Sequence, residues 1–424
     1  MRQSDKPAVS IVKCKPYDSL ESVKPRVKEA LELIGGLESL IMPGDTVLLK
    51  PNLVKPFHYS TGATTNPFLI EAVVELAREA HAGRIIIGEG SCVGVNTEDC
   101  FEACGINDIA NRCNCEVVDF TKDDVEYVVN PFACKIRRIR LPRTFMEANV
   151  VINLPVMKTH GAVDVSLGLK NMKGLIQTND KKRFHKWGLV QGLLDLIAVA
   201  MPDLTILDGT VAMEGAGPTF GNPVDLGLLM ASKNTVALDR VALEVMGMTL
   251  EEVDHIRLAG EAGLGETDLD KIEVLGESID GVRHPFARNE LDHKVLEEYG
   301  IEIVAPYACS GCSNSITSYI LRRERTNDLE KFRNCILVLG QNPTYLPETK
   351  TADKHVIRLG NCTRNLPDYE DFVPGCPPLL YGALDDIVQS DTIEKHNVPC
   401  TPRTPLDSNA TNQDLASWLS YNYD

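Results

Sequence analysis

The chain has no long apolar run and little positive charge. No stretch approaches the ~20 uninterrupted apolar residues that a membrane span needs, and the N-terminal segment MRQSDKPAVSIVKC lacks the apolar core of a secretory signal. We therefore expect no membrane span and a cytoplasmic location. The 43 basic residues are outnumbered by 60 acidic ones, which gives a net charge of −17. This field would repel a polyanion, so the sequence predicts no nucleic-acid partner.

The familiar nucleotide-binding loops are missing as well. The glycine-rich segment EGAGPTFGNP has neither a P-loop lysine nor a G-x-G-x-x-G spacing. Thirteen cysteines is a high number for 424 residues, yet they form no compact disulfide framework. In a reducing compartment, cysteines serve in metal binding, redox chemistry and core packing.

What is present is a regular alternation of strand-like and helix-like segments. It runs from about residue 8 to 290, and a shorter series follows. Such alternation predicts an α/β fold with mainly parallel sheets and helices on both faces. We place the larger domain at 1–295, a smaller α/β domain at 296–395 and a C-terminal tail at 396–424.

Polar side chains follow several of the predicted strands, at the edge where α/β sheets bind ligands. We expect Lys158, His160 and Lys170 to be catalytic. The expected cofactor-binding residues are Lys50, Asn52, Glu89, Asn171, Lys173 and Asp208. Taken singly, each lysine or aspartate is more often a solvated loop residue or a helix cap, and His160 more often a structural histidine. Their joint placement favours a polar cleft.

The segment SLGLKNMKGLI predicts a glycine-bracketed loop that carries Lys170, Asn171 and Lys173. Two lysines in an otherwise acidic protein indicate an anionic ligand, such as a carboxylate or phosphate. We therefore expect an anionic small molecule, or a second and unidentified cofactor, in the N-terminal cleft.

Four cysteines in the last third of the chain have the neighbours of a four-thiolate iron–sulfur site: Cys309, Cys312, Cys362 and Cys376. The first two form a C-x-x-C turn, and glycines and prolines flank the others, which lets the backbone wrap a cluster. Structural zinc and unliganded core thiols are the alternatives, although zinc sites usually bring two close cysteine pairs. Cys335 begins a predicted strand and is excluded because it should lie at the opposite edge.

Four further cysteines lie upstream at positions 100, 104, 113 and 115. A second metal site built from Cys100, Cys104, Cys113 and Cys115 is geometrically conceivable. Core packing of small apolar thiols is the favoured interpretation, because a helix interior poor in glycine is an unusual cradle for a cluster.

The order C-x-G-C, G-x-C and P-G-C-P-P over Ile301 to Val388 resembles the proximal [4Fe–4S] module of the nickel–iron hydrogenase small subunit and its relative in complex I. The resemblance implies a flavodoxin-like domain in which the four cysteines ligate one cubane. Since one cluster stores one electron, an electron-transfer role would call for a ferredoxin-like electron donor or acceptor. The further cysteine–histidine motifs of hydrogenases are missing. The resemblance therefore implies one cluster and not a chain of several clusters.

The segments LKPNLV, TTNP, PVMKTHG, SLGLKNMKGLI and DGTVAMEGAGP resemble the domain-of-unknown-function family numbered 362, over about residues 8 to 280. Many members of that family carry ferredoxin-type clusters in the same chain. The family is also distantly similar to the catalytic domain of nickel-pincer lactate racemase, in which lysine and histidines hold an organonickel cofactor. Here, that similarity would point to His160 and to Lys170 or Lys173.

Three functions follow as hypotheses. The first is an anaerobic iron–sulfur oxidoreductase that passes single electrons through one [4Fe–4S] cluster to a substrate or cofactor in the polar cleft. The second is a non-redox isomerase or racemase-like enzyme with a metal cofactor bound in the cleft. The third is an electron-transfer or scaffold subunit of a larger oxidoreductase. An oligomer is compatible with all three.

Overall fold

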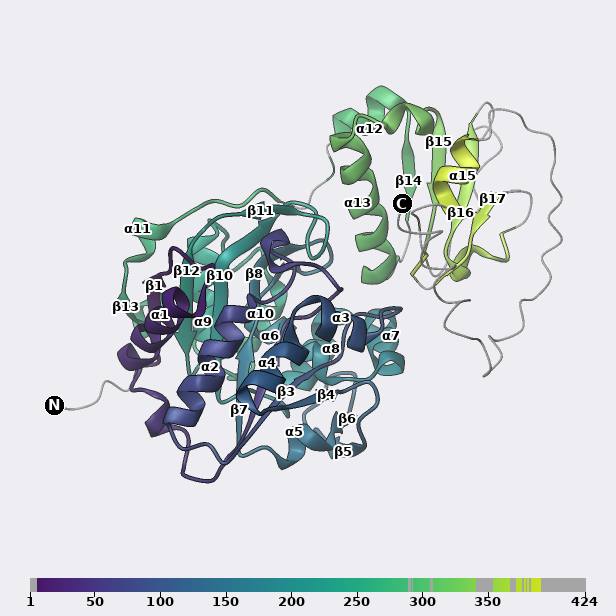
Figure 1. The fold of residues 1–424 in the computed structure, drawn as a ribbon. Coiled ribbons are helices and arrows are strands. Elements are labelled where there is room, and N and C mark those ends of the chain that lie inside the picture. Colours follow the sequence, from purple (N-terminus) through teal and green to yellow (C-terminus); the bar gives the residue numbers. More distant parts are fainter. Residues whose placement is uncertain are drawn as a thin grey trace. The chain divides into compact units, whose positions relative to one another are not determined.

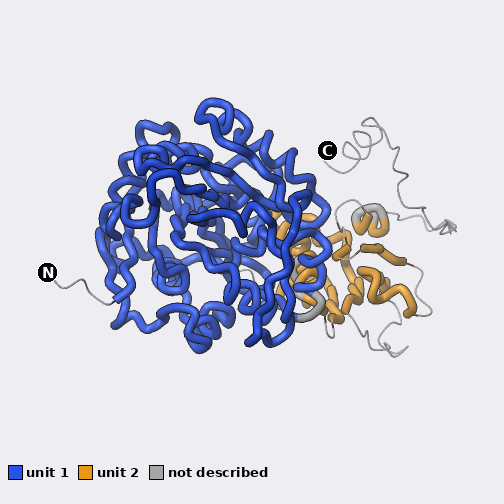
Figure 2. The backbone as a smooth tube through the Cα atoms, turned by 90° about the horizontal axis from the view of Figure 1, so that it is seen from below, with its two compact units in different colours: residues 1–290 blue, residues 291–424 orange. Residues whose placement is uncertain are grey.

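The computed structural model describes residues 6–288, 291, 293–305, 308–340, 354–366, 371–375, 377–378, 380 and 383–389. The chain forms two compact units, Met1–Glu290 and Leu291–Asp424, which Figure 2 colours separately. The sequence placed this boundary after residue 295. The predicted tail at 396–424 lies outside the described residues.

The first unit is built on an eleven-stranded sheet. Its strands are β1 (Ala8–Lys13), β2 (Thr46–Pro51), β3 (Arg84–Glu89), β4 (Glu116–Asp119), β7 (Val150–Leu154), β8 (Val156–His160), β9 (Asp164–Ser166), β10 (Leu204–Glu214), β11 (Asn222–Val224), β12 (Leu228–Ser232) and β13 (Glu273–Gly276). The main path runs β13-β1-β12-β10-β7-β2-β3-β4. Along this path β12 is antiparallel to both neighbours, and the remaining strands are parallel to one another.

Helices cover both faces of this sheet, as Figure 1 shows. They are α1 (Leu20–Leu33), α2 (Pro67–Glu79), α3 (Thr97–Ala103), α4 (Ile106–Cys113), α5 (Arg143–Glu147), α6 (Gly168–Asn171), α7 (Thr178–Trp187), α8 (Leu189–Ile197), α9 (Thr235–Val245), α10 (Asp254–Glu261) and α11 (Ile279–Val282). The side chains of each strand alternate between two apolar cores. In β2, for example, Leu48 joins the core under α8 and α9, and Leu49 joins the core under α1 and α2. The predicted α/β architecture is confirmed.

Local sequence signals set several of these elements. Asn66 caps α2 by accepting a hydrogen bond from Phe68 N–H, and Pro67 occupies the first turn, where its missing N–H costs nothing. Asn234 caps α9 in the same way. The sequence NVVINLPVMKTH predicted one strand, but Pro155 divides it into β7 and β8. Proline cannot donate to a ladder, so β8 pairs separately with β10 and β9.

A separate two-stranded hairpin consists of β5 (Val125–Val129) and β6 (Arg138–Pro142). Its inner face carries Val128, Ile139 and Leu141, which pack against the core on the α8 side of the sheet. Its outer face is exposed.

The second unit contains a four-stranded parallel sheet. Its strands are β14 (Glu302–Val304), β15 (Cys335–Val338), β16 (His355–Leu359) and β17 (Asp371–Val373), and its helices are α12 (His293–Tyr299), α13 (Ser310–Arg325) and α15 (Ala383–Gln389). The strands lie side by side in chain order. A flavodoxin-like sheet reverses its first two strands, and the described strands show no such reversal. The α/β class is therefore confirmed, while the flavodoxin-like order is wrong for the described part.

Helix α13 begins at Ser310, directly after Cys309. The C-x-x-C turn is therefore the first turn of a helix, and its backbone N–H groups are the ones that a helix leaves without partners. In the part of the chain that the structure describes, no helix is long and apolar enough to cross a membrane.

Candidate functional site

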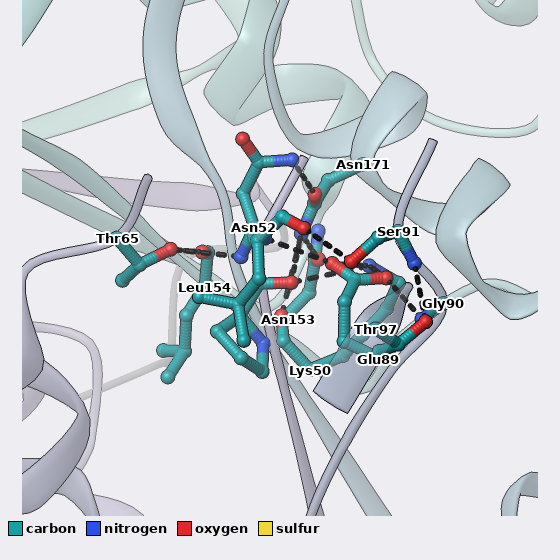
Figure 3. A network of polar contacts seen from close by, with 12 residues as sticks. Lys50, Asn52, Thr65, Glu89, Gly90, Ser91, Thr97, Asn153, Leu154 and Asn171 are labelled. Carbon is teal, nitrogen blue, oxygen red and sulfur yellow. Dashed lines mark hydrogen bonds and ion pairs between the residues drawn. The ribbon is translucent and has the colours of Figure 1, made fainter. Parts of the chain in front are cut away.

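A buried ion pair between Lys50 and Glu89 lies at the carboxyl ends of the neighbouring strands β2 and β3 (Figure 3). Lys50 Nζ is 3.1 Å from both carboxylate oxygens, and the two side chains are 0% and 3% exposed. The backbone N–H groups of Leu53 and Gly90 donate to the same carboxylate at 3.2 and 2.8 Å. A buried pair is tolerated when such bonds satisfy its remaining atoms. Glu89 is thus fully engaged as a structural acceptor.

A chain of amides extends from this pair. Asn171 Nδ2 donates to Asn153 Oδ1 at 2.8 Å, and Asn171 Oδ1 accepts from Asn52 Nδ2 at 2.8 Å (Figure 3). Asn52 Oδ1 in turn accepts from Lys158 Nζ at 2.5 Å. The Ala63 carbonyl is a second acceptor for Lys158 Nζ, at 2.7 Å. The network therefore fixes the position of the Lys158 amine.

Gly174 lies against the ion pair where no side chain would fit. A Cβ atom there would lie 2.0 Å from Glu89 Oε1 and 2.5 Å from Lys50 Nζ. The short helical segment Met172–Leu175 can pack against the Lys50–Glu89 ion pair only because residue 174 is glycine.

Helix α7 brings two more basic side chains that the sequence analysis missed. Lys181 Nζ donates to the carbonyls of Gly90 and Ser91 at 2.7 and 2.8 Å. His185 Nε2 lies 2.7 Å from Lys173 Nζ. The alternation of charged residues in TNDKKRFHKW resembles a solvated helix, so nothing local distinguishes Lys181 from the exposed Lys182.

Burial changes the ionisation of these amines. It lowers the pKa of Lys158 to about 7, with a further contribution from the charge of Lys170. Burial, followed by the charge of Lys50, lowers the pKa of Lys170 to about 8. The pKa of Lys181 is lowered to about 8, and that of Lys173 falls well below its ordinary value, again chiefly through burial. Near neutral pH, a neutral amine is therefore available on Lys158, whereas Lys170 and Lys181 are mostly protonated.

Lys170 differs from its neighbours in its contacts. Within the described part of the chain, its amine has no hydrogen bond or ion pair, although Lys50, Lys158, Lys173 and Lys181 all have one. Lys170 is also partly exposed. We call Lys50, Lys158, Lys170, Lys173, Lys181, His160 and His185 the lysine cluster.

Two histidines adjoin these lysines. His160 Nδ1 accepts a hydrogen bond from Ala162 N–H at 3.0 Å, which places the proton of the neutral ring on Nε2. Burial and the charge of Lys170 hold the pKa of His160 well below its usual range. His255, which the sequence analysis missed, is 1% exposed, and both ring nitrogens lack partners among the described residues. Burial, followed by the charge of Lys170, lowers the pKa of His255 to about 3.

The predicted loop around Lys170 and Asn171 is helical instead. It forms α6, and the carboxylate of Asp239 on α9 accepts the N–H groups of Gly168 and Leu169, both at 2.8 Å. This cap is 71 residues away in sequence from Gly168, so no local pattern could reveal it. Burial raises the pKa of Asp239 to about 7.

The structure does not bring Asp208 into contact with the lysines. We expected it to follow a strand, but β10 continues through it to Glu214. Its carboxylate accepts from Asn66 N–H at 2.8 Å and from Thr210 Oγ1 at 2.6 Å. Asp208 therefore orients the start of α2.

The second unit brings together the loops that carry the predicted iron–sulfur ligands. Cys312 Sγ lies 3.7 Å from the Cβ position of Gly360, shortly before Cys362. Asn361 exchanges hydrogen bonds with Gly375, through Asn361 N–H at 2.8 Å and Asn361 Oδ1 at 3.0 Å. Cys376 itself lies outside the described residues.

The first turn of α13 favours a thiolate. A hydrogen bond from Cys312 and the backbone N–H groups of Cys312 and Gly311 lower the pKa of Cys309 to about 6, although burial opposes them. Cys335 is buried at the start of β15, and burial raises its pKa to about 11. Cys335 thus begins its strand, as the sequence predicted.

The upstream cysteines pack as expected for apolar thiols. Cys100 and Cys104 belong to the core on the α1 and α2 side of the sheet, and Cys113 and Cys115 pack against it. Among the described residues, no three His, Cys, Asp or Glu side chains are arranged to hold one metal ion.

The family model for the domain of unknown function DUF362 matches residues 47–244. A thylakoid-associated protein of Synechocystis sp. is 30% identical to the chain over 268 residues, which cover 61% of this chain and 81% of the relative. The chain belongs to the DUF362 family. The nine residues predicted for the N-terminal site all lie inside the DUF362 match, and the four predicted cluster cysteines lie outside it.

Two solved structures are also similar to this DUF362 protein. The lactate racemase apoprotein from Thermoanaerobacterium thermosaccharolyticum aligns with a TM-score of 0.37 and 14% identity, over 57% of each chain. A structure from Thermotoga maritima aligns with a TM-score of 0.36 and 11% identity, over 84% of this chain and 97% of that one.

Proposed function

We propose that the N-terminal unit is an enzyme that binds a small carboxylate and moves a proton at the carbon beside it. The observation that carries this proposal is the gathering of five lysines and two histidines whose charges act on one another, while the nearby carboxylate of Glu89 is already engaged by Lys50. The cluster thus has basic groups in excess. An anion that enters it would find ammonium groups to pair with and neutral amines to accept a proton.

The contacts of Lys158 fit the role of general base. A neutral amine has two N–H donors, and the acceptors Asn52 Oδ1 and Ala63 O occupy both. The lone pair is left to take the substrate proton, whose bonding electrons then delocalise into the carboxylate. Lys170 has no competing partner among the described residues, so its ammonium form is the group that we assign to the substrate carboxylate. His160, with its proton on Nε2, would donate to a substrate oxygen.

A metal cofactor of the kind that we considered for a racemase-like enzyme would be held by His160 with Lys170 or Lys173, and these side chains all belong to the lysine cluster. The proton transfer proposed here is assigned to the amines of the cluster and does not require a metal.

The test is calorimetric titration of the full chain with lactate, pyruvate and phosphate at pH 7.5, in buffers of different ionisation enthalpy. A bound anion should raise the pKa of Lys158 and Lys170, so binding should take up protons and the apparent enthalpy should depend on the buffer. Lys170→Ala should weaken binding at least about tenfold, because a charged hydrogen bond is lost. Lys182→Ala, an exposed neighbour of Lys181, is the matched control.

Proton transfer is measured separately by the exchange of the α-hydrogen of each bound acid in D₂O by NMR. Exchange that disappears in Lys158→Met but persists in Lys182→Ala supports the assigned base. Buffer-independent heats with all three anions would contradict the proposal.

A second candidate function is electron transfer through one [4Fe–4S] cluster held by Cys309, Cys312, Cys362 and Cys376. The lowered pKa of Cys309 and the meeting of the loops at Gly360, Asn361 and Gly375 favour it. Each iron of a cubane takes one thiolate, so the four ligands need not converge on a single point. When bound, the cluster would supply one-electron chemistry, and a ferredoxin-like protein would be its partner.

Anaerobic purification with iron and sulfide analysis tests this function. We expect about four irons per chain and an electron paramagnetic resonance signal after reduction. Cys362→Ser should lower the iron content, and the exposed Cys134→Ser in the first unit should not. Iron-free protein from an anaerobic preparation, or equal iron in both variants, would contradict it.

A further inference from the structure

The β5–β6 hairpin presents apolar side chains to solvent. Phe132 at its tip is 90% exposed, and Tyr127 and Val129 on its outer face are 59% and 52% exposed. Figure 1 shows the hairpin at the edge of the first unit, beside α5. In contrast, the opposite face of the same two strands is packed against the core.

The tip is held in place by buried polar groups. The Asp195 carboxylate, on α8, accepts hydrogen bonds from the N–H groups of Cys134, Lys135 and Ile136 at 2.7 to 2.8 Å. Asn130, also buried, accepts from Phe132 N–H at 3.0 Å and donates to the Asp195 carbonyl at 3.1 Å. Three donors on one carboxylate define a fixed loop. These hydrogen bonds therefore hold Phe132 in its exposed position.

Basic residues surround the exposed ring. Residues 127–146 contain five basic side chains and no acidic one, in a chain of net charge −17. Lys135, Arg137 and Arg138 are exposed and make no ion pair with any described residue. Arg138 stacks on Tyr127 at 4.6 Å from the ring centroid. The nearby acids Asp124 and Glu126 are paired with Arg143. The surface around the tip is thus cationic.

We propose that this hairpin docks on the surface of an anionic lipid bilayer, with Phe132 inserted at the headgroup level and Lys135, Arg137 and Arg138 against the lipid headgroups. A ring that projects from a narrow cationic tip matches a soft, negatively charged interface into which single side chains insert. A stable protein interface buries ~800 Å² on each partner, and a projecting tip offers no such broad apolar area. The proposal is independent of the chemistry assigned to the lysine cluster.

The experiment is co-sedimentation of the full chain with vesicles of phosphatidylcholine alone and with about a third phosphatidylglycerol, a mixture that carries negative surface charge. We expect binding to the mixed vesicles only, and weaker binding in 0.5 M salt because the charge attraction is screened. Phe132→Ser should lower the partition coefficient about tenfold or more. Removal of each charge, by Lys135→Gln or Arg137→Gln, should lower it about fivefold.

Two controls separate docking through the hairpin from nonspecific adsorption to the vesicles. Met42 is 66% exposed elsewhere on the unit, so Met42→Ser should bind like the wild type. In Phe132→Trp, the indole emission should shift to the blue on mixed vesicles and be quenched by brominated acyl chains. Equal sedimentation of the wild type and Phe132→Ser would overturn the proposal. So would the absence of binding to mixed vesicles, including a result in which the chain is retained only by heparin or by an acidic protein.

Discussion

The lysine cluster and the cysteine loops both lower the pKa of a reactive group, but through different physical causes. In the first unit, burial removes water from ammonium groups and lowers the pKa of Lys158 to about 7. In the second unit, hydrogen-bond donors at the start of α13 stabilise a negative thiolate and lower the pKa of Cys309 to about 6. Desolvation produces a neutral base in one case, and donated hydrogen bonds produce a charged thiolate in the other. Both sites hold their reactive form near neutral pH.

The difference also concerns how each site is assembled. The lysine cluster depends on contacts between segments that are far apart in sequence, such as those of Lys181 with the carbonyls of Gly90 and Ser91, which follow β3. The thiolate environment of Cys309 comes from the three residues that follow it. Substitutions within the lysine cluster should therefore lower the free energy of unfolding of the first unit more than substitutions around Cys309 lower that of the second unit.

The largest effect on the first unit is expected from Glu89→Gln. It leaves the buried Lys50 without its counter-charge, which should lower the free energy of unfolding by about 3–5 kcal/mol. Urea denaturation at pH 7 measures this. In the exposed pair of Lys122 with Glu98, Glu98→Gln should cost less than about 1 kcal/mol. Equal losses in the two variants would contradict the buried pair described here.

A smaller loss is expected from Asp239→Asn, because an amide oxygen cannot accept from Gly168 and Leu169 as two carboxylate oxygens do. We expect a cost of about 1–3 kcal/mol. In the wild type, the pKa of Asp239 is raised from 3.8 to about 7, so its protonation stabilises the fold. This contribution should decline as the pH rises from about 4 to 7 and then stay constant. Denaturation curves across that range should show a slope that the variant lacks.

The pH dependence of anion binding sharpens the comparison further. Because Lys170, the group that we assign to the anion, has a pKa of about 8, the charged form that attracts the anion is lost as the pH rises through this value. Affinity should be constant below about pH 7 and fall about tenfold per pH unit above 8 if one proton is required. Titration from pH 6 to 10 tests this. An affinity that stays constant to pH 10 would mean that ordinary lysines bind the anion.

The smallest effect concerns the thiolate. In iron-free protein, alkylation of Cys309 by iodoacetamide should reach half its maximal rate near pH 6, following its lowered pKa. The advantage over an ordinary thiol at pH 7 should be only a few-fold, because nucleophilicity falls with pKa. Mass spectrometry of the modified peptides gives both rates, with Cys134 as the exposed reference. A midpoint near pH 9 would remove the contrast between the two units.

The sequence predicted the strand ends of the site well, and for a physical reason. Parallel strands deliver their carboxyl ends to one edge, so Lys50, Glu89 and Lys158 could be grouped from the alternation alone. Asp208 was misplaced because β10 continues past the apolar run that defined it. Lys181, His185 and Asp239 could not be assigned, because their partners are remote in sequence and their own helices look ordinary.

The loop that Asp195 fixes also affects how tightly the hairpin tip can bind. A flexible loop loses conformational entropy when it settles on a surface, and that loss subtracts from its affinity. Here the N–H groups of Cys134, Lys135 and Ile136 are already bound to one carboxylate. The tip of this hairpin is ordered before it meets any partner, so little of the free energy of contact at Phe132 is lost to ordering the loop.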